Sequence, residues 1–206
     1  MIEAALMGGS LPGPWAPWEF VGSTTLLATG LTPVEGKFPS GIQEGDLVVA
    51  IMTPRTETIR TTMSSAGWQR WAQGPQDYVC TARFAPGLEV PRWQRGGANS
   101  IFVAVLVFRA SGWSAVKLES HVSPAQPVAV TTRLQNELLL AIGITPQTTR
   151  GWVCRMNGAD PEVRLERALS PAVQVYSANI DFPHLISGVA VDALSGDERN
   201  LILTVS

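Results

Sequence analysis

Asp46-Leu47-Val48-Val49-Ala50-Ile51-Met52 is a run that predicts a strand with apolar side chains on both of its faces. Two other runs, Ile101–Phe108 and Leu138–Ile144, have the same character. Strands of this kind usually belong to parallel sheets covered by helices. No long window of the sequence shows helical periodicity, however, so a doubly wound fold is excluded. Two arrangements remain: a sandwich with small residues outward, or a sheet whose outer face meets another subunit.

Alternating or β-branched runs, punctuated by Gly, Pro, Asn and Ser, predict the other strands. They are Trp18–Val21, Asp77–Phe84, Ala172–Ile180 and Leu201–Val205. The best helix candidate starts at Asp160-Pro161-Glu162, where a capping residue precedes a proline. The residues after it alternate equally well as a strand, so this segment stays open. We therefore predict an all-β protein, an antiparallel β-sandwich of jelly-roll-like form.

The order of the motifs repeats along the chain and predicts two similar halves, 18–110 and 111–206. The run Asp46–Ile51 recurs as Glu137–Ile142, and a Thr-Pro pair follows each run. A Gly-Trp pair and an Asn-led closing strand come next in both halves: Gly67-Trp68 and Asn99-Ser100-Ile101, then Gly151-Trp152 and Asn200-Leu201-Ile202. Two such halves can pack face to face, each burying the side that the other leaves open.

Residues 1–17 differ from the rest because Gly8-Gly9 and three prolines prevent them from forming a helix or a central strand. This segment is nevertheless too apolar for an ordinary solvated terminus. We predict an extended arm that docks on a partner through Ile2, Leu6, Met7, Leu11, Trp15 and the neighbouring Trp18. The alternative is a frayed terminus.

The composition suggests an interaction protein. Of the 206 residues, 45% are hydrophobic and only 16% are charged, whereas charged residues make up roughly 25% of an ordinary soluble domain. A formal net charge of −2 argues against nucleic-acid binding. No run reaches the ~20 apolar residues of a membrane helix, and Glu3 stands where a secretory signal has basic residues. We expect a protein made and used from the cytoplasm, with no nucleic-acid or membrane partner.

No motif for covalent chemistry is apparent. The two histidines, His121 and His184, lie in proline-containing segments without further ligands at zinc spacing. Gly112-Trp113-Ser114-Ala115-Val116 lacks the second glycine of a nucleophile elbow. The acidic group at 192–198 fits no calcium loop, so a solvated turn is the better interpretation. We predict no enzymatic activity, no cofactor and no metal; a hydrolase built from paired carboxylates is the weakest alternative.

Tryptophan and cysteine give the remaining site predictions. Of the seven tryptophans, Trp68 and Trp152 are expected to form matched corners of the two halves. Trp93 and Trp113 lie near glycines, where they could serve as core residues, as subunit contacts or as platforms for a ligand such as a sugar. Cys80 and Cys154 are expected to be buried free thiols, although a single bridge between them stays open.

Three short motifs carry a resemblance to a known family. They are Phe38-Pro39-Ser40-Gly41-Ile42-Gln43-Glu44-Gly45-Asp46-Leu47-Val48-Val49-Ala50, Ala66-Gly67-Trp68 and Val105-Leu106-Val107-Phe108-Arg109-Ala110. From about residue 18 onward the chain resembles the β-sandwich accessory proteins of tailed bacteriophages and related gene-transfer particles. The resemblance implies a virion structural role, no catalysis and assembly around symmetry axes. It defines no functional residues.

These observations predict a bacteriophage virion protein that decorates or cements the capsid or forms part of the tail. It would assemble in the host cytoplasm and contact other virion proteins through the arm and a broad sheet face. Symmetric self-association would cover its doubly apolar strands. The alternative is a carbohydrate-binding adhesion module of a phage fibre, with Trp93 or Trp113 as the platform.

Overall fold

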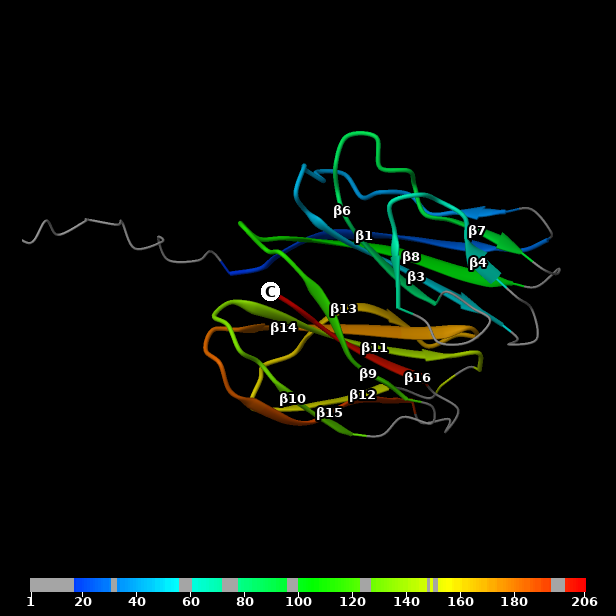
Figure 1. The fold of residues 1–206 in the computed structure, drawn as a ribbon. Helices are drawn as coiled ribbons and strands as arrows, with labels where there is room; N and C mark the ends of the chain where they lie inside the picture. The colour runs from blue at the N-terminus through cyan, green and yellow to red at the C-terminus, as the bar shows by residue number, and fades with distance from the viewer. Residues whose placement is uncertain are drawn as a thin grey trace, which may run out of the picture.

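The protein is almost entirely β-structure, as predicted (Figure 1). The computed structural model describes residues 17–30, 33–55, 61–71, 78–95, 100–122, 127–147, 149, 152–193 and 199–206. Within these ranges the chain forms strands and turns and no helix, and therefore no helix that could span a membrane. The predicted arm residues Ile2, Leu6, Met7, Leu11 and Trp15 lie outside the described residues.

The first half consists of a five-stranded antiparallel sheet and a three-stranded antiparallel sheet. The large sheet has the order β1-β8-β3-β6-β5 and the small sheet the order β2-β7-β4. The strands are β1 (Glu19–Ala28), β2 (Val34–Glu35), β3 (Leu47–Pro54), β4 (Thr61–Met63), β5 (Gln69–Arg70), β6 (Val79–Arg83), β7 (Arg92–Arg95) and β8 (Ile101–Arg109).

The second half has the same strand order. The strands are β9 (Val116–Val122), β10 (Val128–Thr131), β11 (Glu137–Thr145), β12 (Trp152–Asn157), β13 (Glu162–Arg167), β14 (Ala172–Ile180), β15 (Leu185–Ala193) and β16 (Arg199–Val205). Its sheets run β13-β14-β11-β16-β9 and β10-β15-β12. When β9 is matched with β1, and each later strand with its counterpart, both sheets reproduce the order found in the first half.

The four sheets stack as layers, with the two five-stranded sheets face to face in the middle (Figure 1). Leu47, Val49 and Ile51 of β3 share one buried cluster with Leu138 and Leu140 of β11. This central core also contains Trp18, Trp113 and alternate residues of β8, β14 and β16. The halves therefore pack as two subunits of a dimer would, although they belong to one chain.

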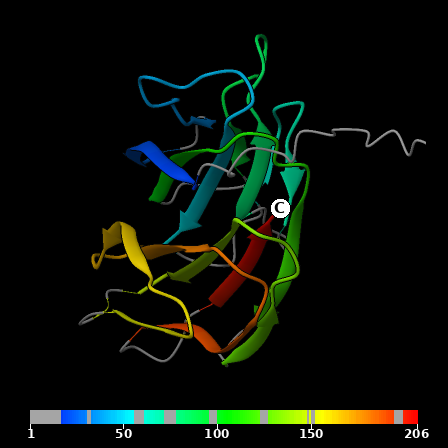
Figure 2. The same ribbon diagram turned by 90° about the vertical axis from the view of Figure 1, so that its left-hand side faces the viewer.

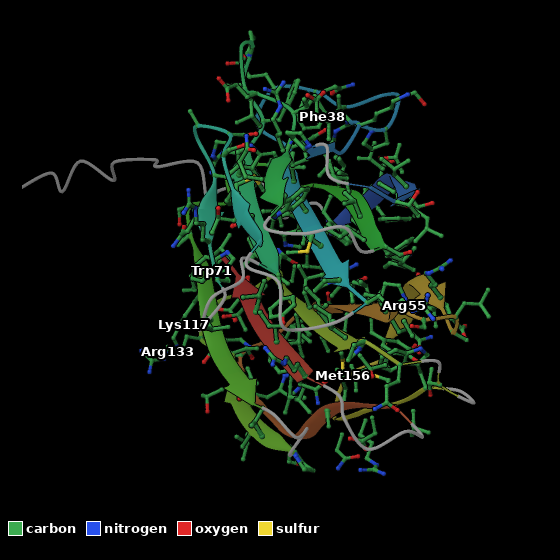
Figure 3. The ribbon with its side chains drawn as sticks, turned by 90° about the vertical axis from the view of Figure 1, so that its right-hand side faces the viewer. Phe38, Arg55, Trp71, Lys117, Arg133 and Met156 are labelled. Atoms are coloured by element: carbon green, nitrogen blue, oxygen red, sulfur yellow. The ribbon has the colours of Figure 1, made fainter. Side chains whose placement is uncertain are left out.

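The intervening residues of the same strands face the small sheets. Val48, Ala50 and Met52 belong to the core of the first half, against which Phe38 packs. Leu139 and Ala141 belong to the core of the second half, together with Met156 (Figure 3). Every residue of β3 and β11 is buried. The prediction that other molecules must cover the doubly apolar strands is therefore wrong, because the opposite half covers them.

Two local expectations are settled by strand positions. The segment after Asp160, for which the sequence allowed either a helix or a strand, forms a strand, β13. The prediction that Trp68 and Trp152 form matched corners is wrong. Trp68 lies between β4 and β5, whereas Trp152 is the first residue of β12, the counterpart of β4. Trp68 instead donates its indole N–H to the Glu89 carbonyl at 3.0 Å within the first half. The runs Asp46–Ile51 and Glu137–Ile142 do occupy equivalent strands, β3 and β11.

Arginines stack on aromatic rings where the halves meet. In each contact the guanidinium belongs to one half and the ring to the other half or to the connection between β8 and β9. The contacts are Arg83 over Trp113, Arg164 over Phe20, Arg167 over Phe102 and Arg199 over Tyr78, at 3.9, 5.2, 5.0 and 4.9 Å from the ring centroids. Arginine suits this position because its weakly hydrated plane stacks on rings.

Candidate functional site

Trp18 lies between the two halves and not on an exposed arm. Its side chain is only 5% exposed, and its indole N–H donates to the Asn136 carbonyl of the second half at 2.8 Å. The Trp18 carbonyl accepts from the Asn179 side-chain amide at 3.1 Å. The prediction that Trp18 belongs to the docking arm is therefore wrong, because the second half holds this residue within the fold.

Trp113 makes the reciprocal contact. It precedes the first strand of the second half, and its indole N–H donates to the Gly45 carbonyl of the first half at 2.7 Å. The Arg83 guanidinium stacks on its ring and donates to its carbonyl. The rings of Trp113 and Trp18 contact each other, with centroids 6.2 Å apart and planes tilted by 45°.

The two accepting carbonyls occupy equivalent turns. Gly45 and Asn136 directly precede Asp46 and Glu137, the acids that open the two central apolar runs, and both have left-handed backbone, with φ of 91° and 58°. Glycine adopts this conformation freely, and asparagine tolerates it better than most residues. Because each turn reverses sharply here, its last carbonyl points outward to the tryptophan of the other half.

An acidic residue holds each turn in place. The buried Asp46 carboxylate accepts from the Gln43 backbone N–H at 2.8 Å, and the buried Glu137 carboxylate accepts from the Arg133 and Leu134 N–H groups at 3.1 and 3.0 Å. Asp46 also forms two hydrogen bonds of 2.8 Å with Arg109. Hydrogen bonding to Asp46 is the main reason why the pKa of Arg109 is raised. The acid that opens each apolar run thus shapes the turn before it.

A pocket of about 380 Å³ opens where these parts meet. Its lining residues come from the start of the chain, the connection between the halves, the turn before β11 and the C-terminus: Trp18, Ala110, Ser111, Gly112, Trp113, Ser114, Leu134, Gln135, Asn136 and Ser206. Both indole N–H groups are already bonded to carbonyls, so the tryptophans offer the pocket apolar ring surface. Leu134 at its side is 55% exposed. The pocket suits an apolar or aromatic side chain better than a polar ligand.

The position of the pocket connects it with the N-terminal segment. Trp18 lines it, and Pro17 follows directly on the apolar residues 1–16. The C-terminal residue lies at the same end, where its backbone pairs with Ala115 (Figure 1). Sequence patterns did not predict this pocket, because its walls come from four separate segments.

The two predicted ligand platforms are buried. Trp93 is 0% exposed and belongs to the core between the sheets of the first half, so it offers a sugar no open face. The platform prediction is wrong for Trp93; the alternation Arg92-Trp93-Gln94, with only the tryptophan apolar, was a signal of a strand facing a core. Trp113 is 8% exposed, and Arg83 stacks on its ring. It borders the pocket but forms no open platform.

Among the side chains that the structure describes, the remaining candidate groups do not come together in one site. Neither Cys80 nor Cys154 forms a disulfide; Cys80 is buried, and burial raises the pKa of the partly buried Cys154 to about 12. A thiol with such a pKa stays protonated and unreactive at neutral pH. Asp192 forms an ion pair with Arg155 at 2.7 Å. The side chain of His121, and residues 197 and 198, lie outside the described residues.

His184 ties two loops of the second half together. Its ring nitrogens lie 2.7 Å from the Phe182 carbonyl and 2.8 Å from the Gly158 carbonyl. These contacts raise the His184 pKa, because only the protonated ring donates to both carbonyls. Within the described ranges, no group of three or more His, Cys, Asp or Glu side chains is placed to hold a metal ion. Comparison with protein-family models, with curated proteins and with solved structures finds no match to this chain.

Proposed function

We propose that this chain is a non-enzymatic structural protein of a tailed-bacteriophage particle, attached to its neighbours through the end that carries the pocket. One observation carries the proposal: an apolar pocket walled by two tryptophans lies where the apolar segment 1–16 joins the fold. Attachment through this end would use the pocket and the segment together.

The burial pattern supports attachment at this end over attachment through a sheet face. The two large sheets cover each other and are covered again by the small sheets, so their apolar faces are used within the chain. The segment that precedes Pro17 in the sequence contains five further large apolar residues: Ile2, Leu6, Met7, Leu11 and Trp15. Apolar anchors seated in a pocket contribute most of the binding energy of many interfaces.

The duplicated architecture also suits a structural role. Two sandwiches packed around one continuous core form a single unit, which would hold a fixed position on an assembly. Decoration of a capsid and incorporation into a tail both need such a body with one attachment end. The low content of charged residues, 16%, favours a protein that gives part of its surface to partners.

The proposal is tested by following the tagged chain in particles purified by density gradient from the host that carries its gene. The native chain should copurify with particles at a fixed copy number. A chain lacking residues 2–16 and a Leu134→Glu variant should both remain in the unassembled fraction while keeping native circular dichroism. A Leu169→Glu variant serves as the control, because Leu169 is 64% exposed but does not line the pocket. A native chain absent from the particles would refute the proposal.

A further inference from the structure

The outer edge of β1 carries a long row of unpaired backbone groups. β1 forms the end of the first five-stranded sheet and pairs along one side with β8. Among the described residues, no other backbone hydrogen bond reaches Glu19–Ala28. An exposed edge of this kind presents free N–H and C=O groups that can pair with a strand of another molecule.

The other three edges of the large sheets are short or charged, whereas the only such device on β1 is a bulge between Phe20 and Gly22, which leaves Gly22–Ala28 as a regular edge. β5 has only two residues. β9, the counterpart of β1, carries the Lys117–Glu119 ion pair, and β13 carries four charged residues within six. β1 has no charged residue from Phe20 to Ala28, and its Leu26 and Leu27 are 42% and 49% exposed. Charge and short length are the usual means by which proteins protect an edge strand.

The unprotected edge lies on the side opposite Trp71 and Lys117. In Figure 3, Trp71 and Lys117 mark the side of β5 and β9, and β1 and β13 lie on the other. Figure 2 shows β1 in blue above β13 in gold at one edge of the molecule. Val163 of β13 adds a further side chain that is 52% exposed. Both central sheets therefore end in exposed apolar residues on this side.

We propose that β1 pairs in antiparallel fashion with β1 of a second copy of this chain. Pairing of a strand with its own copy is isologous, so it satisfies the same row of groups on both molecules and closes as a dimer. Any other exposed edge of the large sheets would bring a two-residue or charged strand against the ten residues of β1. Among the edges of the large sheets, only a second β1 offers β1 a partner strand of the same length that also lacks charged residues from Phe20 to Ala28.

The charges beside this edge also permit the dimer. In an antiparallel pair, the two copies of Glu19 lie at opposite ends of the joined strands and do not repel each other. The same two-fold axis brings the neighbouring β13 strands toward each other. β13 begins with Glu162 and ends with Arg167, so reversal of one copy places opposite charges near each other. The dimer would join two five-stranded sheets into one continuous sheet across the axis.

The experiment is light scattering coupled to gel filtration on the full chain at about 100 µM, a concentration at which a micromolar dimer is formed. The native chain should have twice the monomer mass of 22.1 kDa. Leu26→Lys/Leu27→Lys should shift it to monomer, with at least a tenfold weaker association. The matched control, Leu169→Lys/Phe182→Lys, changes leucine and phenylalanine side chains that are 64% and 68% exposed on loops, and it should remain dimeric.

If the double lysine variant loses its circular dichroism, Thr25→Lys provides the test, because the exposed Thr25 contributes no core contact. This variant should also be monomeric. The proposal is overturned if the native chain is monomeric at this concentration, or if folded lysine variants remain dimeric. A dimer that dissociates when residues 2–16 are deleted, but not when lysines are placed on β1, would assign the contact to the N-terminal segment instead. This proposal does not depend on attachment to a particle.

Discussion

Trp18 and Trp113 make the same hydrogen bond in opposite directions across the two halves. Each precedes the first strand of its own half, and each donates its indole N–H to the left-handed turn before the central strand of the other half. The exchange is what a two-fold axis would produce between identical subunits. Here one chain keeps this arrangement, and both tryptophans line the pocket.

Replacing either tryptophan should weaken the junction. We expect Trp18→Phe and Trp113→Phe each to lower the free energy of unfolding by about 1–3 kcal/mol, because a carbonyl loses its donor and ring volume is lost. Urea denaturation measures the effect. The double variant should deviate from additivity by more than ~0.5 kcal/mol, since the two rings touch. Trp71 donates its indole N–H to Thr81 within the first half. The effects of Trp18→Phe and Trp71→Phe on the free energy of unfolding should therefore be additive. Additivity of the Trp18 and Trp113 changes would contradict the described contact.

The buried ion pair before β3 should matter more than an exposed one. Arg109→Met leaves the Asp46 carboxylate, 2% exposed, without its charged partner, and should lower the unfolding free energy more than Lys117→Met does. Lys117 is the ion-pair partner of Glu119, and its own side chain is 61% exposed. Lys117→Met should therefore lower the free energy of unfolding by less than about 1 kcal/mol. Both values come from urea denaturation under the same conditions. Equal losses in the two variants would show that the Asp46 pair does not hold its turn.

Protonation of His184 should stabilise the loops that it joins. The hydrogen bonds to the carbonyls of Phe182 and Gly158 raise its pKa in the folded chain above the ordinary value of 6.5. The stabilisation is therefore complete below that value and is lost as the pH rises through the folded pKa. Thermal unfolding of the native chain and of His184→Gln should show a gap in Tm that is larger near pH 5.5 than near pH 9. A gap that widens with pH would contradict the contact.

The strands buried on both faces were the easiest to predict. Leu47–Met52, Ile101–Phe108 and Leu138–Ile144 read as apolar runs because one face meets a small sheet and the other meets the opposite half. What covers these strands was harder to predict. A second half of the same chain and a second subunit both require apolar residues on the covered face, so the sequence pattern is the same in the two cases. The strands of the small sheets, such as β10 and β15, were missed since they are short or mix polar and apolar residues.

The tryptophans show where sequence patterns failed. Trp18 and Trp93 lie near proline or glycine, which suggested exposed segments, yet packing between sheets buries both. The pocket depends on Leu134, Asn136 and Ser206, which are distant from Trp18 in the sequence. A local sequence pattern cannot predict that four distant segments lie together. Only the repeated order of the motifs indicated the two halves whose packing forms the pocket.

The central claim, that one chain buries both faces of its middle strands, is tested most directly on β11. Leu139 faces the small sheet of its own half, Leu140 faces the opposite half, and both are 0% exposed. We predict that Leu139→Ala and Leu140→Ala each lower the unfolding free energy by about 2–5 kcal/mol. Urea denaturation at about 0.1 µM keeps a micromolar dimer dissociated, so only contacts within the chain contribute. A Leu140→Ala variant as stable as the native monomer would show that this face is open, and would contradict the packing of the two halves.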